Sequence, residues 1–325
     1  MGLIPEALGA TRATLGALAG DIPGLRRIDP LGERDPEFIR ETLPTYRALC
    51  DLYFRPKVRG LEQIPDEGPV LLVGNHSGGT LIADTFAFAF AFYTHFGPER
   101  RFHQLAHDLV FKVPGLVGLR RYGTMPASHR NAEAALERRA AVLVYPGGDF
   151  ETYRPSWRSG EIQFGGRSGF VRLALANDVP IVPVVAIGGQ ETALFLTRGR
   201  RLAELLRLDP LLRLKVLPIQ LAPPFGVTVL DLPGRLPLPS QITIQVLPKL
   251  DVREQFGPDP DEREVYEAVT GAMQEALDEL SRERDLPLVG SIGPREEESE
   301  VAERLARRLV ISEAERTGES AGARS

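Results

Sequence analysis

The segment PVLLVGNHSGG, residues 69–79, indicates the fold class most directly, because an unbroken apolar run ends there in polar residues and two glycines. A short run of Val and Leu bounded by turn residues is typical of a strand that is buried on both faces of a sheet. Similar runs recur at residues 101–107, 140–148, 179–189 and 241–248, the last with clean apolar–polar alternation. We therefore expect several strands, one of them within residues 69–76.

Helical patterns lie between these runs, at residues 131–140 and 168–177. Strands that alternate with helices are typical of an α/β domain with a parallel sheet. The fold class that we predict is therefore α/β, with a mostly parallel central sheet flanked by helices.

Other helices are predicted on either side of this alternation. Residues 36–54 have apolar spacing near 3.6 with Pro44 in the middle, which predicts one kinked helix or two short ones. Residues 86–92 alternate Phe with Ala, the spacing of a strand, but alanine favours a helix, and we predict a helix buried nearly all round. Residues 258–281 and 294–316 are charged and amphipathic, and we predict a helix for each.

Residues 208–239 are apolar yet rich in proline. Proline is excluded from helix interiors and from central strands, so we predict no regular structure there. Such a segment is either a loop that contacts a membrane or a loop packed over the core. For the whole chain we predict a loosely attached N-terminal arm (1–35), one domain (36–285) and a charged helical tail (286–325) whose end is disordered.

Composition excludes some classes of protein and partner. The chain has 325 residues, 43% of them apolar and 26% charged, with a formal net charge of −5, which does not suggest a nucleic-acid-binding protein. Cys50 is the only cysteine, so neither an intrachain disulfide nor a Cys-rich metal site is expected, which fits a reducing, cytoplasmic compartment. The N-terminus lacks the pattern of a secretory signal. The apolar stretch at residues 80–96 is shorter than the roughly 20 residues of a membrane span, so we predict no transmembrane helix.

The first candidate site follows the predicted strand at residues 69–76. Ligands of open α/β sheets bind beyond the carboxyl ends of the strands, so His76 is well placed for a catalytic base. The first acid after it is Asp84, eight residues on, and a carboxylate near a histidine can fix its tautomer and stabilise the imidazolium. The alternative is that His76 only satisfies a buried polar contact.

Two further candidates lie downstream. Gly147 and Gly148 end another predicted strand, and consecutive glycines can present N–H groups to an oxyanion, while Glu151 could bind the hydroxyls of an acceptor. The alternative there is a tight turn with a solvated acid. Arg167 stands at the start of the predicted helix 168–177, a place suited to a phosphate. Arg154 and Arg158 lie between the second and third sites, and for each of Arg154, Arg158 and Arg167, taken singly, we expect surface charge.

Several other chemistries lack their motifs. The sequence has no Gly-x-x-x-x-Gly-Lys-Ser/Thr loop, no Gly-x-Gly-x-x-Gly after the first strand, no His-Glu-x-x-His and no Gly-x-Ser-x-Gly. The remaining histidines have no recognisable metal-ligand spacing: His95, His103, His107 and His129. We therefore expect neither a metal nor a cofactor.

Four motifs in order resemble the phospholipid/glycerol acyltransferase superfamily, which includes the lysophosphatidate acyltransferases, over roughly residues 50–250. They are NHSGG (75–79), YGTMPA (122–127), VYPGG (144–148) with Glu151, and VPIVPV (179–184). The Pro-Gly-Gly-x-x-Glu form looks more like the branch of diacylglycerol acyltransferase type 2. One departure is that the family places an aspartate five residues after the histidine, where this chain has Leu81. A bulge at Gly78 and Gly79 could absorb the extra residues and let Asp84 serve.

The resemblance implies a glycerol-phosphate-acyltransferase-like fold and transfer of a fatty acyl group from acyl-CoA or acyl carrier protein to a hydroxyl of a glycerolipid or lysophospholipid. It implies a neutral glycerolipid or alcohol acceptor beside a phosphorylated one, and peripheral attachment to the inner face of the membrane. His76 would be the base and Asp84 its support. The residues expected to bind substrate are Asn75, Gly147, Gly148, Glu151 and Arg167. The alternatives are a thioesterase or lipid hydrolase, and a catalytically silent lipid-binding protein.

Overall fold

The computed structural model describes residues 31–107, 110–111, 117–205, 216–229, 231 and 235–284. The predicted N-terminal arm, apart from residues 31–35, and the predicted tail at residues 286–325 lie outside this part of the chain, as does the predicted helix at residues 294–316. The predicted domain boundaries are therefore not tested and stay predictions.

A seven-stranded sheet forms the centre of the fold, in the order β1-β10-β6-β2-β5-β3-β4. Its strands are β1 (Lys57–Arg59), β2 (Val70–Gly74), β3 (Phe102–Ala106), β4 (Thr124–Pro126), β5 (Ala141–Val144), β6 (Ile181–Ile187) and β10 (Thr243–Val246). The five strands from β6 to β4 are parallel, whereas β10 is antiparallel to β6 and β1 is parallel to β10. The prediction of an α/β fold with a mostly parallel sheet is confirmed.

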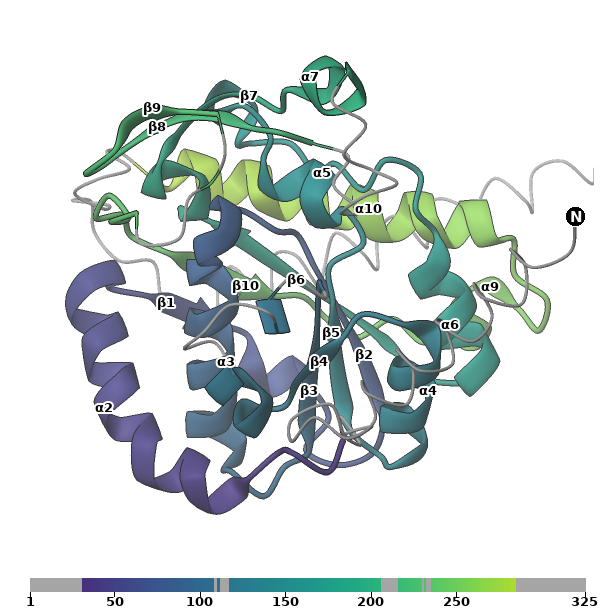
Figure 1. Ribbon diagram of the computed structural model, residues 1–325. Helices are drawn as coiled ribbons and strands as arrows, with labels where there is room; N and C mark the ends of the chain where they lie inside the picture. Colours follow the sequence, from purple (N-terminus) through teal and green to yellow (C-terminus); the bar gives the residue numbers. More distant parts are fainter. Residues whose placement is uncertain are drawn as a thin grey trace, which may run out of the picture.

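Helices cover both faces of this sheet (Figure 1). Side chains of β2 alternate between the two cores: Val70 and Leu72 pack on the side of α2 (Pro36–Phe54) and α3 (Ala83–Phe96). Leu71 and Val73 pack on the opposite side. The helices of that side are α4 (His129–Glu137), α6 (Gly169–Asn177) and α10 (Glu262–Arg282), and the short α9 (Val252–Phe256) packs beside α6. Because both faces of β2 are buried, its sequence is continuously apolar rather than alternating.

Local sequence accounts for the start of α2 and for the helical state of α3. Asp35 caps α2 by accepting from the N–H groups of Glu37 and Phe38, and Pro36 occupies the first turn, where its missing N–H leaves no bond unmade. Pro44 lies inside α2, which is one helix rather than two. The Phe/Ala segment is the helix α3, as predicted, and most of its side chains are buried.

A second, three-stranded antiparallel sheet corrects one prediction. Residues 208–239 contain β8 (Ile219–Ala222) and β9 (Gly226–Thr228), which form a hairpin and extend to β7 (Leu194–Thr197). The prediction of no regular structure was therefore wrong for these two strands. The prolines at positions 218, 223 and 224 flank β8 instead of interrupting it, so its ladder of hydrogen bonds stays intact. Residues 206–215, 230 and 232–234 lie outside the described part.

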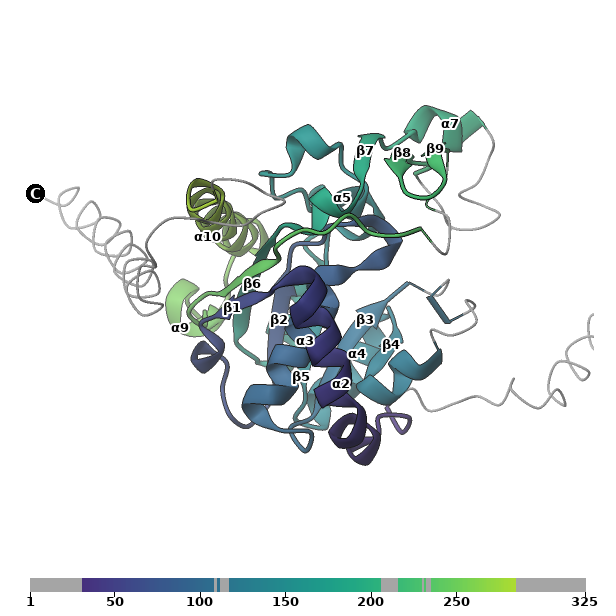
Figure 2. The same ribbon diagram turned by 90° about the vertical axis from the view of Figure 1, so that its left-hand side faces the viewer.

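The small sheet lies beyond the carboxyl ends of the central strands, beside α5 (Gly148–Thr152) and α7 (Arg200–Leu205), in both views (Figures 1 and 2). It has its own small core, in which Phe195 and Ala222 pack with Tyr153. The candidate site therefore lies between the central sheet and this small sheet, at the edge where ligands of α/β sheets bind.

Candidate active site

The loop that carries His76 is fixed at its start by Asn75. The side-chain amide of Asn75 is buried, donates to the carbonyl of Ala186 at 2.8 Å and accepts from the N–H of Ala186 at 2.7 Å. Both bonds tie the end of β2 to the neighbouring strand β6. Asn75 therefore sets the point at which the chain leaves the sheet, and its predicted role in substrate binding stays a prediction.

His76 and Asp84 are brought together. The Nδ1 atom of His76 lies 3.5 Å from Oδ2 of Asp84, and this nitrogen is buried and makes no hydrogen bond within the described structure. The imidazole stacks on the ring of Tyr145, with centroids 4.2 Å apart and planes 18° from parallel. Since the His76 side chain is still 13% exposed while Nδ1 is buried, the accessible part of the ring lies away from Asp84.

The eight-residue separation between these two side chains is absorbed by a turn. Gly78 and Gly79 have φ angles of 91° and 67°, in the left-handed region that glycine adopts without strain. A 3₁₀ turn at Gly79–Leu81 follows, and α3 then begins at Ala83. Asp84 is thereby placed in the first turn of α3, pointing back toward the loop.

The carboxylate of Asp84 is almost fully buried, and it accepts several hydrogen bonds from neighbouring protein groups. Its Oδ2 accepts from the N–H and the hydroxyl of Ser77 at 2.9 and 3.1 Å, and its Oδ1 accepts from the N–H of Thr85 at 2.7 Å. The hydroxyl of Thr85 donates in turn to the phenol of Tyr145. Burial, with Asp84 nearby, raises the pKa of Tyr145 well above its ordinary value, so this ring stays neutral under the imidazole.

Glu151, on α5, lies beneath the same loop rather than in solvent. It is fully buried; its Oε2 accepts from the N–H of His76 and its Oε1 from the N–H of Gln163, both at 3.0 Å. Burial raises the pKa of this carboxyl, while Arg154 and the two N–H donors act in the opposite direction. The geometry excludes the alternative of a solvated acid, and the predicted contact with an acceptor stays a prediction.

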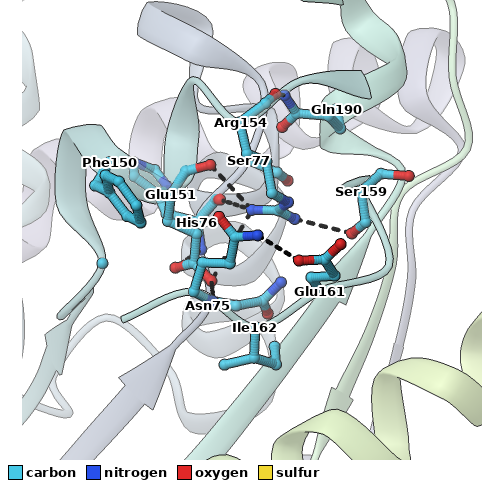
Figure 3. A network of polar contacts seen from close by, with 12 residues as sticks. Asn75, His76, Ser77, Phe150, Glu151, Arg154, Ser159, Glu161, Ile162 and Gln190 are labelled. Carbon is cyan, nitrogen blue, oxygen red and sulfur yellow. Dashed lines mark hydrogen bonds and ion pairs between the residues drawn. The ribbon is translucent and has the colours of Figure 1, made fainter. Parts of the chain in front are cut away.

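Arg154 is also buried, which corrects the expectation of surface charge. Its Nη1 donates to the carbonyls of His76 at 2.8 Å and Glu151 at 3.1 Å, and its Nη2 donates to Ser159 at 3.1 Å (Figure 3). Burial lowers the pKa of this guanidinium. Glu151 thus binds the backbone N–H of His76, and Arg154 binds its backbone carbonyl. Arg158, by contrast, is exposed and pairs with Glu161.

Gln190 is a further residue that sequence reasoning missed. Its Oε1 accepts from the N–H of Gly78 at 3.3 Å, and its Nε2 donates to the carbonyl of Arg154. No motif marks it, because it is 112 residues from Gly78.

For Arg154 a signal was present: it stands three residues after Glu151, the spacing of an ion pair on one helical turn.

The two glycines after β5 make a tight turn. A Cβ on Gly147 would lie 2.5 Å from the Cβ of Glu151, so only glycine lets this carboxylate reach the loop. Gly148 has a φ of 49°, and its N–H donates to the carbonyl of Tyr145 at 3.1 Å. In the described structure the Gly148 N–H is therefore engaged within the turn.

Arg167 reaches this turn from the start of α6. Its Nη1 donates to the carbonyls of Gly147 at 2.7 Å and Pro146 at 3.2 Å, and its Nη2 lies 3.4 Å from Asp149. The side chain is 43% exposed. Arg167 therefore stabilises the turn and keeps part of its guanidinium accessible to a ligand.

Across the described ranges, no helix combines the length and apolarity needed to cross a bilayer. Nor do these ranges contain three or more His, Cys, Asp or Glu side chains arranged to hold a metal ion.

Comparisons with known proteins assign part of the chain to a family. The family model described as Acyltransferase matches residues 55–187, which include every site residue from Asn75 to Arg167. An uncharacterised protein of Mycobacterium tuberculosis is 30% identical over 272 residues, 82% of this chain and 71% of that protein. Chloroplastic phytyl ester synthase 2 of Arabidopsis thaliana is 34% identical over 142 residues, 40% of this chain and 19% of that protein. The crystal structure of the lysophosphatidate acyltransferase PlsC from Thermotoga maritima aligns with a TM-score of 0.48 at 17% identity, over 76% of this chain and 83% of the other. This chain belongs to the acyltransferase family, the phospholipid/glycerol acyltransferases that its four motifs resemble.

Proposed function

We propose that this acyltransferase moves a fatty acyl group from a thioester donor, acyl-CoA or acyl carrier protein, to a hydroxyl of a lipid acceptor, with His76 as the general base. The observation that carries the proposal is the pair formed by His76 Nδ1 and the buried Asp84 carboxylate at 3.5 Å. A buried carboxylate on one ring nitrogen favours the tautomer with the proton on that nitrogen and leaves the other free to accept one.

The reaction that we propose uses this arrangement. The Nε2 atom of His76 takes the proton of the acceptor hydroxyl while the hydroxyl oxygen attacks the thioester carbonyl. The imidazolium is stabilised by Asp84, the carbon–sulfur bond breaks, and the proton passes to the departing thiolate. The developing oxyanion needs a donor. Because the Gly148 N–H is engaged in the turn, we assign that role to the Gly147 N–H.

A neutral acceptor, an alcohol or an acylglycerol, is the class that we favour. The Pro-Gly-Gly-x-x-Glu form of the second motif resembles the branch of diacylglycerol acyltransferase type 2, and one relative is by name a phytyl ester synthase. In addition, the Arg167 guanidinium already donates to Gly147 and Pro146, which leaves fewer donors for a phosphate. Phosphorylated acceptors remain the second class to test.

We also propose that the small sheet contacts the membrane surface, on the inner face, where the lipid acceptor resides. Leu194, Leu221 and Val227 are direct cross-strand neighbours and are 42%, 42% and 65% exposed; we call this row the apolar face. More exposed apolar side chains occur on or near the same sheet: Trp157, Leu196, Phe225, Val229 and Leu236. A contiguous apolar surface is typical of a membrane or protein contact, and Trp favours the membrane interface.

The test is transfer of a labelled acyl group from acyl-CoA in mixed micelles. The acceptor panel holds a long-chain alcohol, monoacylglycerol, diacylglycerol, lysophosphatidate, other lysophospholipids and glycerol 3-phosphate, with wild type beside His76→Ala. A general base contributes about 10²–10⁴-fold, so we expect ester formation to fall at least that far. His129→Ala is the control, because His129 is exposed and outside the site.

The other outcomes would support one of the two alternatives or exclude His76 as the base. Free fatty acid alone, with every acceptor, would support the hydrolase alternative, since water would then replace the alcohol. Lipid binding without turnover from either type of thioester donor would support the silent lipid-binding alternative. Activity of His76→Ala within a few-fold of wild type would exclude His76 as the base.

A further inference from the structure

A buried ion pair lies next to the catalytic loop but outside every motif of the sequence. The side chains of Asp231 and Arg235 are 1% and 3% exposed, and Nε of Arg235 donates to Oδ1 of Asp231 at 2.7 Å. Neither residue occurs in the four motifs that resemble the family, and the mechanism above does not use them. Their contacts indicate what they do.

Both members of the pair bind the loop between His76 and Asp84. The N–H of Thr80 donates to Oδ2 of Asp231, and Nη2 of Arg235 donates to the carbonyl of Gly78. Asp231 is therefore the acceptor on one side of Gly79, and Arg235 is the donor on the other side. Between these two contacts stands Gly79, where a Cβ would collide with Oδ2 of Asp231 and lie 2.9 Å from Cζ of Phe195.

The same pair also forms hydrogen bonds with the small sheet and with the segment that precedes β7. Nη1 of Arg235 donates to the carbonyl of Thr192 at 3.2 Å, and the side-chain amide of Gln220, on β8, donates to Oδ1 of Asp231 at 2.8 Å. The ion pair thus links the loop of the central sheet to the second sheet. Thr80 adds one neutral link, from its hydroxyl to the phenol of Tyr153 at 3.0 Å.

A gain in the free energy of folding does not by itself explain why this ion pair is buried. Removing two charges from water costs several kcal/mol per ion, and a buried ion pair often contributes no more than an apolar pair of the same volume. What a fully hydrogen-bonded pair provides is one defined geometry. The loop needs such definition, because two glycines with positive φ lie between His76 and α3 and would otherwise permit many conformations.

We propose that Asp231 and Arg235 are positioning residues that fix the Gly78–Thr80 segment, so that the His76 and Asp84 side chains face one another. This inference rests on the proposed role of His76. It gives the small sheet a second role. Besides carrying the apolar face, this sheet then fixes the loop that contains His76.

The first experiment compares two Arg→Lys substitutions. The variant Arg235→Lys keeps the positive charge beside Asp231, but an ammonium cannot reproduce the planar fork that reaches Asp231, Thr192 and Gly78 together. The matched control is Arg59→Lys, because Arg59 makes an ion pair with Glu283 at 2.8 Å away from the site. A misplaced catalytic group loses about 10²-fold in rate. We therefore expect kcat to fall about 10- to 100-fold in Arg235→Lys with little change in the acceptor KM, and to stay near wild type in the control.

The second experiment introduces no charge change. Gly79→Ala and Gly257→Ala both place an alanine at positive φ, at 67° and 85°, but only the first collides with Asp231, whereas nothing lies within 4 Å of a Cβ on Gly257. Gly257→Ala reports the cost of an alanine at positive φ outside the site, and the further loss in Gly79→Ala reports the contacts of its Cβ with Asp231 and Phe195. We expect Gly79→Ala to reproduce the loss of kcat and Gly257→Ala to retain full activity.

A readout without turnover separates this inference from the proposed function. Hydrogen exchange of the peptide that covers residues 77–84 should quicken in Arg235→Lys and in Asp231→Asn, since the Thr80 N–H loses its fixed acceptor. If the wild type forms no ester, the proposed function fails, yet this measurement still tests the pair. Unchanged exchange together with unchanged kcat in Arg235→Lys would overturn the inference. A loss of kcat that is equally large in a His76→Ala background would do so as well, since positioning acts only through His76.

Discussion

Oδ2 of Asp84 lies 3.5 Å from Nδ1 of His76 while it already accepts two hydrogen bonds from Ser77, at 2.9 and 3.1 Å. Ser77 is the residue directly after His76, so the carboxylate holds the backbone of the loop and faces the imidazole at once. A separation of 3.5 Å is longer than a good hydrogen bond, and catalytic hydrogen bonds often shorten only when substrate is bound. Asp84 thus has a structural role beside the catalytic role that we propose for it, and different measurements can separate the two.

Replacing Asp84 by Asn removes the charge that stabilises the imidazolium. We expect kcat to fall about 10²-fold or more, because His76 then lacks its counter-charge during proton transfer. The double variant His76→Ala/Asp84→Asn should be no slower than His76→Ala alone, since residues that act as a unit are not additive. Losses that multiply instead would show that Asp84 acts independently of His76. Circular dichroism and melting temperature would report the structural role.

Replacing Arg154 by Met should destabilise the fold. It leaves the fully buried Glu151 without a counter-charge, and breaking a buried pair on one side costs about 3–5 kcal/mol. The double variant Glu151→Gln/Arg154→Met should cost less than the sum of the two single changes, because no unpaired charge remains. Urea unfolding monitored by fluorescence measures both. The exposed pair Arg158–Glu161 is the control: Arg158→Met should change the free energy of unfolding by less than about 1 kcal/mol.

His103, on β3, should make stability depend on pH. Burial lowers its pKa to about 4, and in the folded protein its ring contacts the carbonyl of Gly123. The unfolded chain, with a histidine pKa near 6.5, binds the proton first as the pH falls. The free energy of unfolding should therefore decrease between about pH 6.5 and pH 4, by about 3 kcal/mol from this group.

Urea titrations at a series of pH values would show this contribution. His103→Asn removes the titrating group, so its profile should be flatter between pH 4 and 6.5 than that of the wild type. His129→Asn should keep the wild-type profile, since His129 is exposed. Parallel profiles for His103→Asn and wild type would contradict the prediction.

A charge on the apolar face should weaken membrane binding. Each fully buried Val or Leu side chain contributes about 1.5–3 kcal/mol, so Val227→Glu should reduce binding to lipid vesicles about tenfold or more. Vesicle flotation measures this, with activity on a short-chain, water-soluble acceptor as evidence that the site is intact. Gln255→Glu, on the exposed side of α9, adds the same charge elsewhere and should bind vesicles like wild type. Equal binding of both variants would remove the apolar face as the contact.

The sequence predicted those parts of the fold that depend on near neighbours. The continuous apolar run before Asn75 predicted a strand buried on both faces, and the Ala-rich composition at residues 86–92 predicted a helix despite alternating Phe. The hairpin of β8 and β9 was missed, because both strands are short and proline flanks one of them. β8 pairs with β7 on one edge and with β9 on the other, and the local pattern of the hairpin does not record the contact with β7.

For the site, the sequence by itself determined which residue types stand at the carboxyl ends of β2 and β5, and hence the candidate base and the glycine turn. Only the tertiary structure decided their partners. It placed Asp84 at His76 through a turn that spacing alone left open, buried Arg154, and brought Asp231 to Thr80 across 151 residues. The physical reason is that local pattern records which face of an element is buried. A contact between distant polar groups is selected by the packing of whole elements, where each buried charge must find a partner.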